Sequence, residues 1–147
     1  MNHRVIWVGR RAACPFLAAA DAYHERLRRM AKVEVLCLRP GSADDEARAM
    51  HKAVAACSFV VALDERGRGH TTLELAARLR GHGERGGTIG YLIGGADGFA
   101  PAALALAHER WSLSAMTLPH RGVLALWLEQ LYRVHSIFAG SRYHRGD

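Results

Sequence analysis

Apolar residues recur along this chain in two alternating patterns. Short, β-branched apolar runs predict buried strands, and longer segments with apolar positions three or four residues apart predict helices. The predicted strands span residues 4–9, 33–38, 58–63, 88–93 and 111–113, and the predicted helices span 15–31, 42–57, 71–80, 101–108 and 122–138. This alternation predicts an α/β fold, with a mostly parallel sheet and helices on both faces. We expect one domain over residues 1–147.

Polar residues mark where several of these elements begin and end. Ser42 with Asp45, and Thr71 with Glu74, have the spacing of helix N-terminal capping pairs. The charged, glycine-containing residues 64–70 predict a loop, and residues 81–87 predict a flexible link.

The last predicted helix is apolar on more than one stripe between Val123 and Phe138. A helix that is apolar nearly all round needs cover on both sides. The sheet can cover one side, and a second copy of the chain can cover the other. We therefore expect a homodimer, with burial inside a monomer as the alternative.

Two apolar runs end in residues that allow a close approach of the main chain to a ligand. Tyr91–Gly98 ends in a glycine-rich turn, and Leu113–His120 contains Leu118-Pro119, where a helix cannot run straight on. Ligands of parallel α/β sheets bind beyond the C-terminal strand ends. The two segments therefore predict a main-chain pocket, although ordinary tight turns explain either one alone. Without a dinucleotide or triphosphate glycine motif, a smaller nucleoside-like cofactor fits better.

Composition narrows the class of protein. Half of the 147 residues are hydrophobic and 23% are charged, as in soluble globular proteins. We expect a cytoplasmic protein with no membrane segment, and the histidines lack a metal-binding spacing. The formal charge is +6, and all basic residues except Lys32 and Lys52 are arginine, which is compatible with an RNA partner.

An ordered set of short motifs resembles one enzyme family. The motifs are I-G-G-A-D-G at Ile93–Gly98, W-S-L-S-A-M-T-L-P-H at Trp111–His120, L-Y-R at Leu131–Arg133 and Y-H-R at Tyr143–Arg145, together with V-G-R at Val8–Arg10 and L-D-E-R-G at Leu63–Gly67. They resemble the RlmH-type SPOUT methyltransferases, which methylate N3 of a pseudouridine in bacterial large-subunit (23S) ribosomal RNA. The likeness covers nearly the whole chain.

The resemblance implies a C-terminal trefoil knot, an S-adenosylmethionine cofactor and a homodimer whose site uses both chains. It implies cofactor contacts from Leu63, Gly94, Gly95, Gly98, Leu113, Ser114, Ala115, Met116, Thr117, Leu118 and Pro119, with Leu63, Leu113, Met116 and Leu118 as apolar walls. The residues it places around the target nucleotide are Arg133, Tyr143, His144 and Arg145. A short chain leaves little room for a separate RNA-binding domain, so the expected substrate partner is the assembled ribosome.

The expected chemistry assigns roles to these last residues. A cation near an imide nitrogen favours its anion, so Arg133 and Arg145 are expected to activate the acceptor. Tyr143 or His144 then orients or deprotonates the base, or Tyr143 stacks on it. Without the resemblance, Arg133 reads as a favourable cation near a helix C-terminus. His120 is expected to fix its loop and not to react.

The chain departs from the family pattern at two positions. Leu124 stands where an arginine is usual, which removes a positive charge near the expected site or dimer contact. Arg142 stands where the tail commonly has proline, which should loosen the tail. A relative that binds without turnover and a methyltransferase with another RNA target therefore stay open as alternatives.

Overall fold

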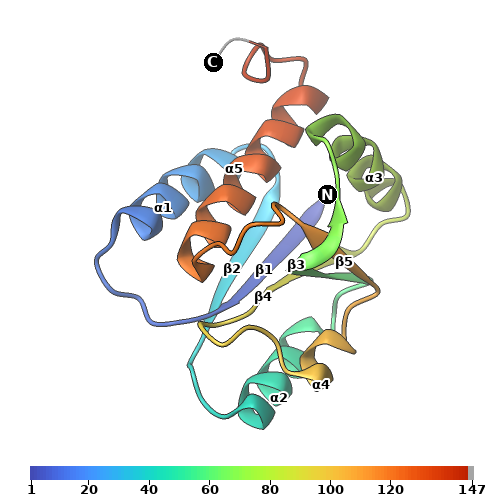
Figure 1. Cartoon of the computed structure of the whole chain (residues 1–147). Coiled ribbons are helices and arrows are strands. Elements are labelled where there is room, and N and C mark those ends of the chain that lie inside the picture. Colours follow the sequence, from blue (N-terminus) through green and yellow to red (C-terminus); the bar gives the residue numbers. More distant parts are fainter. Residues whose placement is uncertain (146–147) are drawn as a thin grey trace.

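Five parallel strands form the central sheet of the computed structural model, which describes residues 1–145 (Figure 1). The strands lie in the order β2-β1-β4-β3-β5. Their bounds are β1 (Asn2–Val8), β2 (Lys32–Leu38), β3 (Phe59–Gly69), β4 (Thr88–Ile93) and β5 (Glu109–Ser112). The helices are α1 (Pro15–Leu27), α2 (Ala43–Val54), α3 (Thr72–Glu84), α4 (Pro101–Leu104) and α5 (His120–Phe138). The predicted α/β class and parallel sheet are confirmed.

Helices cover both faces of this sheet. Figure 1 shows α1, α3 and α5 on one face, and α2 and α4 on the other. Side chains of β1 alternate between the two cores: Val5 and Trp7 belong to the first, and Ile6 and Val8 to the second. All four are at most 1% exposed. A strand buried on both faces reads as a continuous apolar run, which is why the sequence located it.

The predicted loop over residues 64–70 is largely wrong, because β3 continues to Gly69. The register shifts between Leu63 and Arg68, after which Arg68 pairs with Trp111 of β5. A Cβ on Gly67 would lie 2.6 Å from the backbone carbon of Arg110, so only glycine permits this approach. The charge and glycine that indicated a loop belong to an irregular extension of the strand.

Several helix ends differ from the prediction, while the caps agree with it. The Ser42 side chain caps α2, and Thr71 with Glu74 forms a complete capping box on α3. The predicted link at 81–87 is wrong in its first half, because α3 runs to Glu84. The other elements differ by a few residues: α1, α2 and α4 end earlier, at Leu27, Val54 and Leu104, α5 begins at His120, and β5 spans Glu109–Ser112.

Helix α5 receives most of its cover from its own chain. It packs against α1 and α3 as well as the sheet, and Trp127, Leu128 and Leu131 are at most 1% exposed. Leu126 is the exception, with 48% of its surface exposed. The all-round apolar pattern thus no longer requires a second copy, and the dimer and the trefoil knot stay predictions. No helix within residues 1–145 is long and apolar enough to cross a membrane.

Candidate functional site

A cavity of about 600 Å³ opens at the C-terminal edge of the sheet. Three stretches line it: residues 63–66 of β3, 93–99 after β4, and most of 113–120 after β5. Sequence analysis placed the second and third side by side, and the structure brings them together. Every residue expected to contact the cofactor lines this cavity except Ala115. We call it the donor cavity.

The stretch after β4 is a tight turn that presents main chain to the donor cavity. The amide of Gly98 donates to the carbonyl of Gly95 at 3.0 Å, and Gly98 has a φ of +75°. A Cβ on Gly94 would lie 2.9 Å from the carbonyl carbon of Gly98. A side chain at Gly94 would clash with Gly98, and one at Gly98 would be strained by the positive φ, so both positions favour glycine.

Hydrogen bonds shape the stretch after β5. The Ser112 hydroxyl donates to the Ser114 carbonyl at 2.8 Å, and the Met116 amide donates to the Ser114 hydroxyl at 3.0 Å. The Thr117 hydroxyl donates to Glu65 of β3 at 3.1 Å. This last bond joins two walls of the donor cavity, so the extension of β3 takes part in the site.

The apolar walls differ among themselves in burial. Leu63 is 7% exposed and belongs to the core, and Leu113 packs partly against that core. Met116 lines the cavity but is 73% exposed, so its side chain forms part of the rim. The buried part of the wall can pack against an apolar face of a ligand. The exposed rim leaves the cavity open, so that a ligand can enter and leave.

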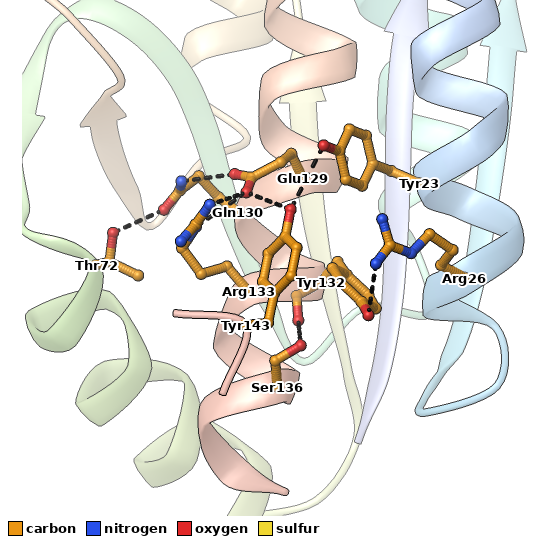
Figure 2. Close-up of polar contacts among 9 residues, drawn as sticks. All are labelled: Tyr23, Arg26, Thr72, Glu129, Gln130, Tyr132, Arg133, Ser136 and Tyr143. Carbon is orange, nitrogen blue, oxygen red and sulfur yellow. Dashed lines mark hydrogen bonds and ion pairs between the residues drawn. The ribbon is translucent and has the colours of Figure 1, made fainter. Parts of the chain in front are cut away.

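Two of the residues expected at the target nucleotide, Arg133 and Tyr143, meet in a separate cluster around Glu129 of α5 (Figure 2). The Glu129 carboxylate accepts from Arg133 Nε at 2.9 Å and Nη2 at 2.7 Å. It also accepts from the Tyr143 hydroxyl at 3.1 Å. The Arg133 guanidinium lies 4.7 Å from the centre of the Tyr143 ring. Glu129 thereby holds a helix residue and a tail residue in one arrangement.

Helix α1 supports this cluster from the side. The Arg26 guanidinium donates to the Tyr132 hydroxyl at 3.0 Å and lies 4.3 Å from the centre of the Tyr132 ring. The hydroxyls of Tyr23 and Tyr143 lie 3.4 Å apart. Figure 2 shows this contact between α1 and the tail. We call Tyr23, Arg26, Glu129, Tyr132, Arg133 and Tyr143 the tail cluster.

The surroundings of Tyr143 determine whether its hydroxyl group can remove a proton from the base. Burial raises the pKa of Tyr143 above its ordinary value, and the hydroxyl of Tyr23 and the carboxylate of Glu129 raise it further. A phenol in this state keeps its proton at neutral pH and donates a hydrogen bond. Of the three roles suggested by sequence, proton removal does not fit Tyr143, and orientation and stacking stay predictions.

The rest of the tail lies beyond this cluster. His144 is partly buried, and its Nδ1 atom has no hydrogen-bond partner within residues 1–145. Arg145 is exposed, and its amide donates to the Arg142 carbonyl at 2.9 Å. The unpartnered Nδ1 atom of His144 is buried, while Arg145 is accessible to a partner.

Within one chain the two halves of the expected site lie apart. Val123, in the first turn of α5, lines the donor cavity, and Arg133 follows ten residues later. At 1.5 Å rise per residue this separates them by about 15 Å along the helix. Figure 1 shows the tail at the end of α5 away from the loops that lead into it. Within the described chain the two halves therefore lie at different levels of α5.

Sequence analysis did not identify Glu129, Tyr23 or Arg26 as members of the site. The spacing of Glu129 and Arg133 is that of an i,i+4 ion pair on a helix, so that contact was detectable. Tyr23 and Arg26 meet their partners more than a hundred residues away, and no local pattern reports that contact.

The structure places Leu124 in the core of the protein. Its side chain is 1% exposed and packs in the core, so it presents no surface to the donor cavity or to a partner. The expected loss of positive charge near the site or dimer contact stays a prediction.

The sequence of this chain is similar to those of known methyltransferases over most of its length. A family model described as "Predicted SPOUT methyltransferase" matches residues 1–144. A protein of Anaeromyxobacter dehalogenans named "Ribosomal RNA large subunit methyltransferase H" is 39% identical, over 99% of this chain and 100% of its own length. A protein of the same name from Verminephrobacter eiseniae is 57% identical over 58% of this chain and 56% of its own length.

Solved structures show the same fold at low identity. A probable methyltransferase from Bordetella pertussis aligns with a TM-score of 0.63 at 18% identity, over 91% of this chain and 94% of that one. A probable methylase family protein from Haemophilus influenzae aligns with a TM-score of 0.64 at 15% identity, over 99% of this chain and 71% of that one.

Proposed function

Because the chain belongs to the SPOUT methyltransferase family, we propose that it methylates N3 of a pseudouridine in large-subunit ribosomal RNA, with S-adenosylmethionine as donor. The observation that carries this proposal is the donor cavity, in which three strand-end stretches converge and two of them present main chain. Its volume of about 600 Å³ lies in the ordinary range of small-molecule sites.

The residues present fit such a donor. Backbone groups of Gly94–Gly98 and of residues 113–119 would hold an adenosine edge, and Leu63 and Leu113 would cover its apolar face. Bound S-adenosylmethionine supplies an electrophilic methyl group on a positively charged sulfur. The chain contributes position and the exclusion of water, which together can lower a barrier by about 7–11 kcal/mol in well-oriented cases.

The acceptor nitrogen must give up its proton before it becomes a good nucleophile. It then forms the new N–C bond while the C–S bond of the donor breaks, and the sulfur leaves as a neutral thioether. Arg133 and Arg145 favour the imide anion through their charge. Tyr143 holds the tail in place through its hydrogen bond to Glu129, and His144 is assigned the proton.

The site is composite in this proposal: the tail of one protomer completes the donor cavity of its partner. The distance along α5 between the donor cavity and Arg133 supports this arrangement, because a single chain keeps the two halves apart. Phe16 and Leu126 supply apolar surface for such a contact, with 48% exposure each. Leu126→Arg should reduce the mass in light scattering to that of the 16.1 kDa monomer.

Replacement of Arg133 tests the catalytic assignment. In Arg133→Ala we expect methylation of ribosomes to be lost while calorimetry still detects S-adenosylmethionine binding. Arg29→Ala, which removes an exposed arginine of the connection after α1, is the matched control. Mass spectrometry of digested ribosomal RNA identifies the product. Undiminished turnover, or methylation of a different nucleoside, would contradict the assignment.

Mixed dimers test the composite site. Arg133→Ala is defective in the tail, and Gly94→Ala is defective in the donor cavity. If each site combines both protomers, a mixture of the two inactive variants regains part of the activity, because one site of the mixed dimer is intact. A mixture that stays inactive, although exchange of protomers is shown by mass, places both halves in one chain.

A further inference from the structure

A second cavity, of about 400 Å³, lies beside the donor cavity. The two share residues 95–99 and His120 as a common wall. On its other side the second cavity is lined by Val8–Arg10 at the end of β1 and by Glu46 of α2. These include the V-G-R motif, which the donor cavity does not use. The second cavity is large enough for a small polar ligand.

Two arginines, Arg10 and Arg121, line this cavity and give it positive charge. Arg121 Nη2 donates to the Arg10 carbonyl at 2.8 Å, while Arg121 Nε is buried without a partner in the described part of the chain. Arg10 itself is exposed and forms no ion pair within residues 1–145. Guanidinium groups with free donors suit a phosphate.

A carboxylate stands at the wall between the cavities. Glu46 Oε1 lies 3.4 Å from where a Cβ of Gly95 would be, so it reaches the main chain that separates the two spaces. Glu46 Oε2 accepts a long hydrogen bond of 3.4 Å from the Gly41 amide. Oε1 thus remains able to accept from an N–H group of a base. Asp97 adds a second carboxylate to the shared wall.

The ring of His120 completes this wall. It stacks on Trp7 with ring centres 6.2 Å apart and an interplanar angle of 29°. Burial lowers the pKa of His120, and the neighbouring charge of Arg121 lowers it further. The ring is therefore neutral at neutral pH, and the charge of the cavity comes from its arginines and carboxylates.

We propose that the second cavity binds a nucleotide of the RNA next to the one that accepts the methyl group, with Arg10 and Arg121 at its phosphate and Glu46 at a base N–H. This inference rests on the proposed function and extends it to a substrate subsite. The shared wall places a nucleotide in this cavity beside the donor cavity, where the methyl-accepting base would lie. The combination of guanidinium groups and a carboxylate matches a nucleotide, which presents an anion and N–H donors together.

Ribosome binding by two variants tests the subsite. Arg10→Ala and Glu46→Gln each remove one proposed contact, and Arg29→Ala and Asp44→Asn remove matching groups that do not line the cavity. The probe is the large ribosomal subunit from cells that lack this protein, and binding is followed by co-sedimentation at several salt concentrations. Calorimetry with S-adenosylmethionine and the melting temperature are measured for every variant.

We expect Arg10→Ala and Glu46→Gln to weaken ribosome binding about tenfold or more. Arg10→Ala should also lower the slope of log affinity against log salt by about one, and Glu46→Gln should not. Donor affinity and melting temperature should match those of the controls. Ribosome binding equal to that of the controls would overturn the proposal, and so would an equal loss of donor binding.

The same data separate this subsite from the proposed function. If the wild-type protein binds ribosomes without methylating them, the proposed function fails, and the salt slope of Arg10→Ala still decides the subsite. If the cavity instead holds the partner's tail, the two variants would lower the dimer mass and leave the salt slope unchanged. That result would overturn the subsite.

Discussion

Neutralising Glu129 should release the tail and slow methyl transfer without affecting the donor. The Glu129 carboxylate accepts from Arg133 at 2.7 Å and 2.9 Å and from Tyr143 at 3.1 Å. The Arg133 and Glu129 side chains are 18% and 14% exposed, so water screens this contact only in part. Glu129→Gln keeps an oxygen that accepts hydrogen bonds but removes the charge.

The expected magnitude follows from these contacts. A hydrogen bond to a charged group contributes about 1.5–3 kcal/mol, and one between neutral groups about 0.5–1.5 kcal/mol. Arg133 lies on α5 with Glu129, so only the contact to Tyr143 joins the tail to Glu129, and this contact should weaken by about 1 kcal/mol. That loss corresponds to a roughly fivefold smaller population of the ordered tail. If the ordered tail is the competent state, kcat falls by up to this factor.

Three measurements check this prediction. Hydrogen exchange of residues 139–145 should speed up in Glu129→Gln, kcat for ribosome methylation should fall, and S-adenosylmethionine affinity should stay within about twofold. Glu25→Gln is the control, because Glu25 is 63% exposed in its pair with Arg28 and should contribute little. Wild-type exchange together with wild-type kcat in Glu129→Gln would refute the reasoning.

Three further predictions concern the donor turn, α3 and the buried histidines. Gly94→Ala should weaken donor binding at least about tenfold in calorimetry, and Gly69→Ala, where a Cβ meets nothing within 4 Å, should not. Gly81→Ala, inside α3 and also in open space, should raise the free energy of unfolding in urea by about 0.5–1 kcal/mol. Burial, the largest cause at each site, lowers the pKa of His3 to about 3 and of His135 to about 4, from an ordinary 6.5. The stability that these neutral histidines contribute is present in full above pH 6.5. It is lost as the pH falls from 6.5 toward 4, because in this range the unfolded chain binds more protons than the folded chain. The free energy of unfolding should therefore be lower at pH 5 than at pH 7 by about 2 kcal/mol or more, and equal values would contradict the assignment.

Patterns in the sequence were sufficient to predict the strands of the sheet and the position of the donor cavity. The strand at Thr88–Ile93 and both helix caps follow from residues within a few positions of one another. The meeting of the stretches after β4 and β5 follows from topology, since parallel strands end at one edge of a sheet. Local propensity and strand direction therefore account for this half of the site.

Contacts between residues far apart in the sequence determine two features that local patterns cannot predict. The charge and glycine of residues 64–69 indicate a loop, and only the approach to β5 makes them a strand. The apolar surface of α5 indicates a missing cover, and only the positions of α1 and α3 show that the chain supplies most of it.

The sequence by itself determined the class of fold, the order of its elements and the main-chain pocket at the strand ends, because each depends on residues close together in the chain. Tertiary structure alone decided that Glu129 holds Arg133 together with Tyr143, that α1 supports them, and that a second cavity shares a wall with the first. Those contacts join residues from separate elements, so their geometry exists only after the elements have packed.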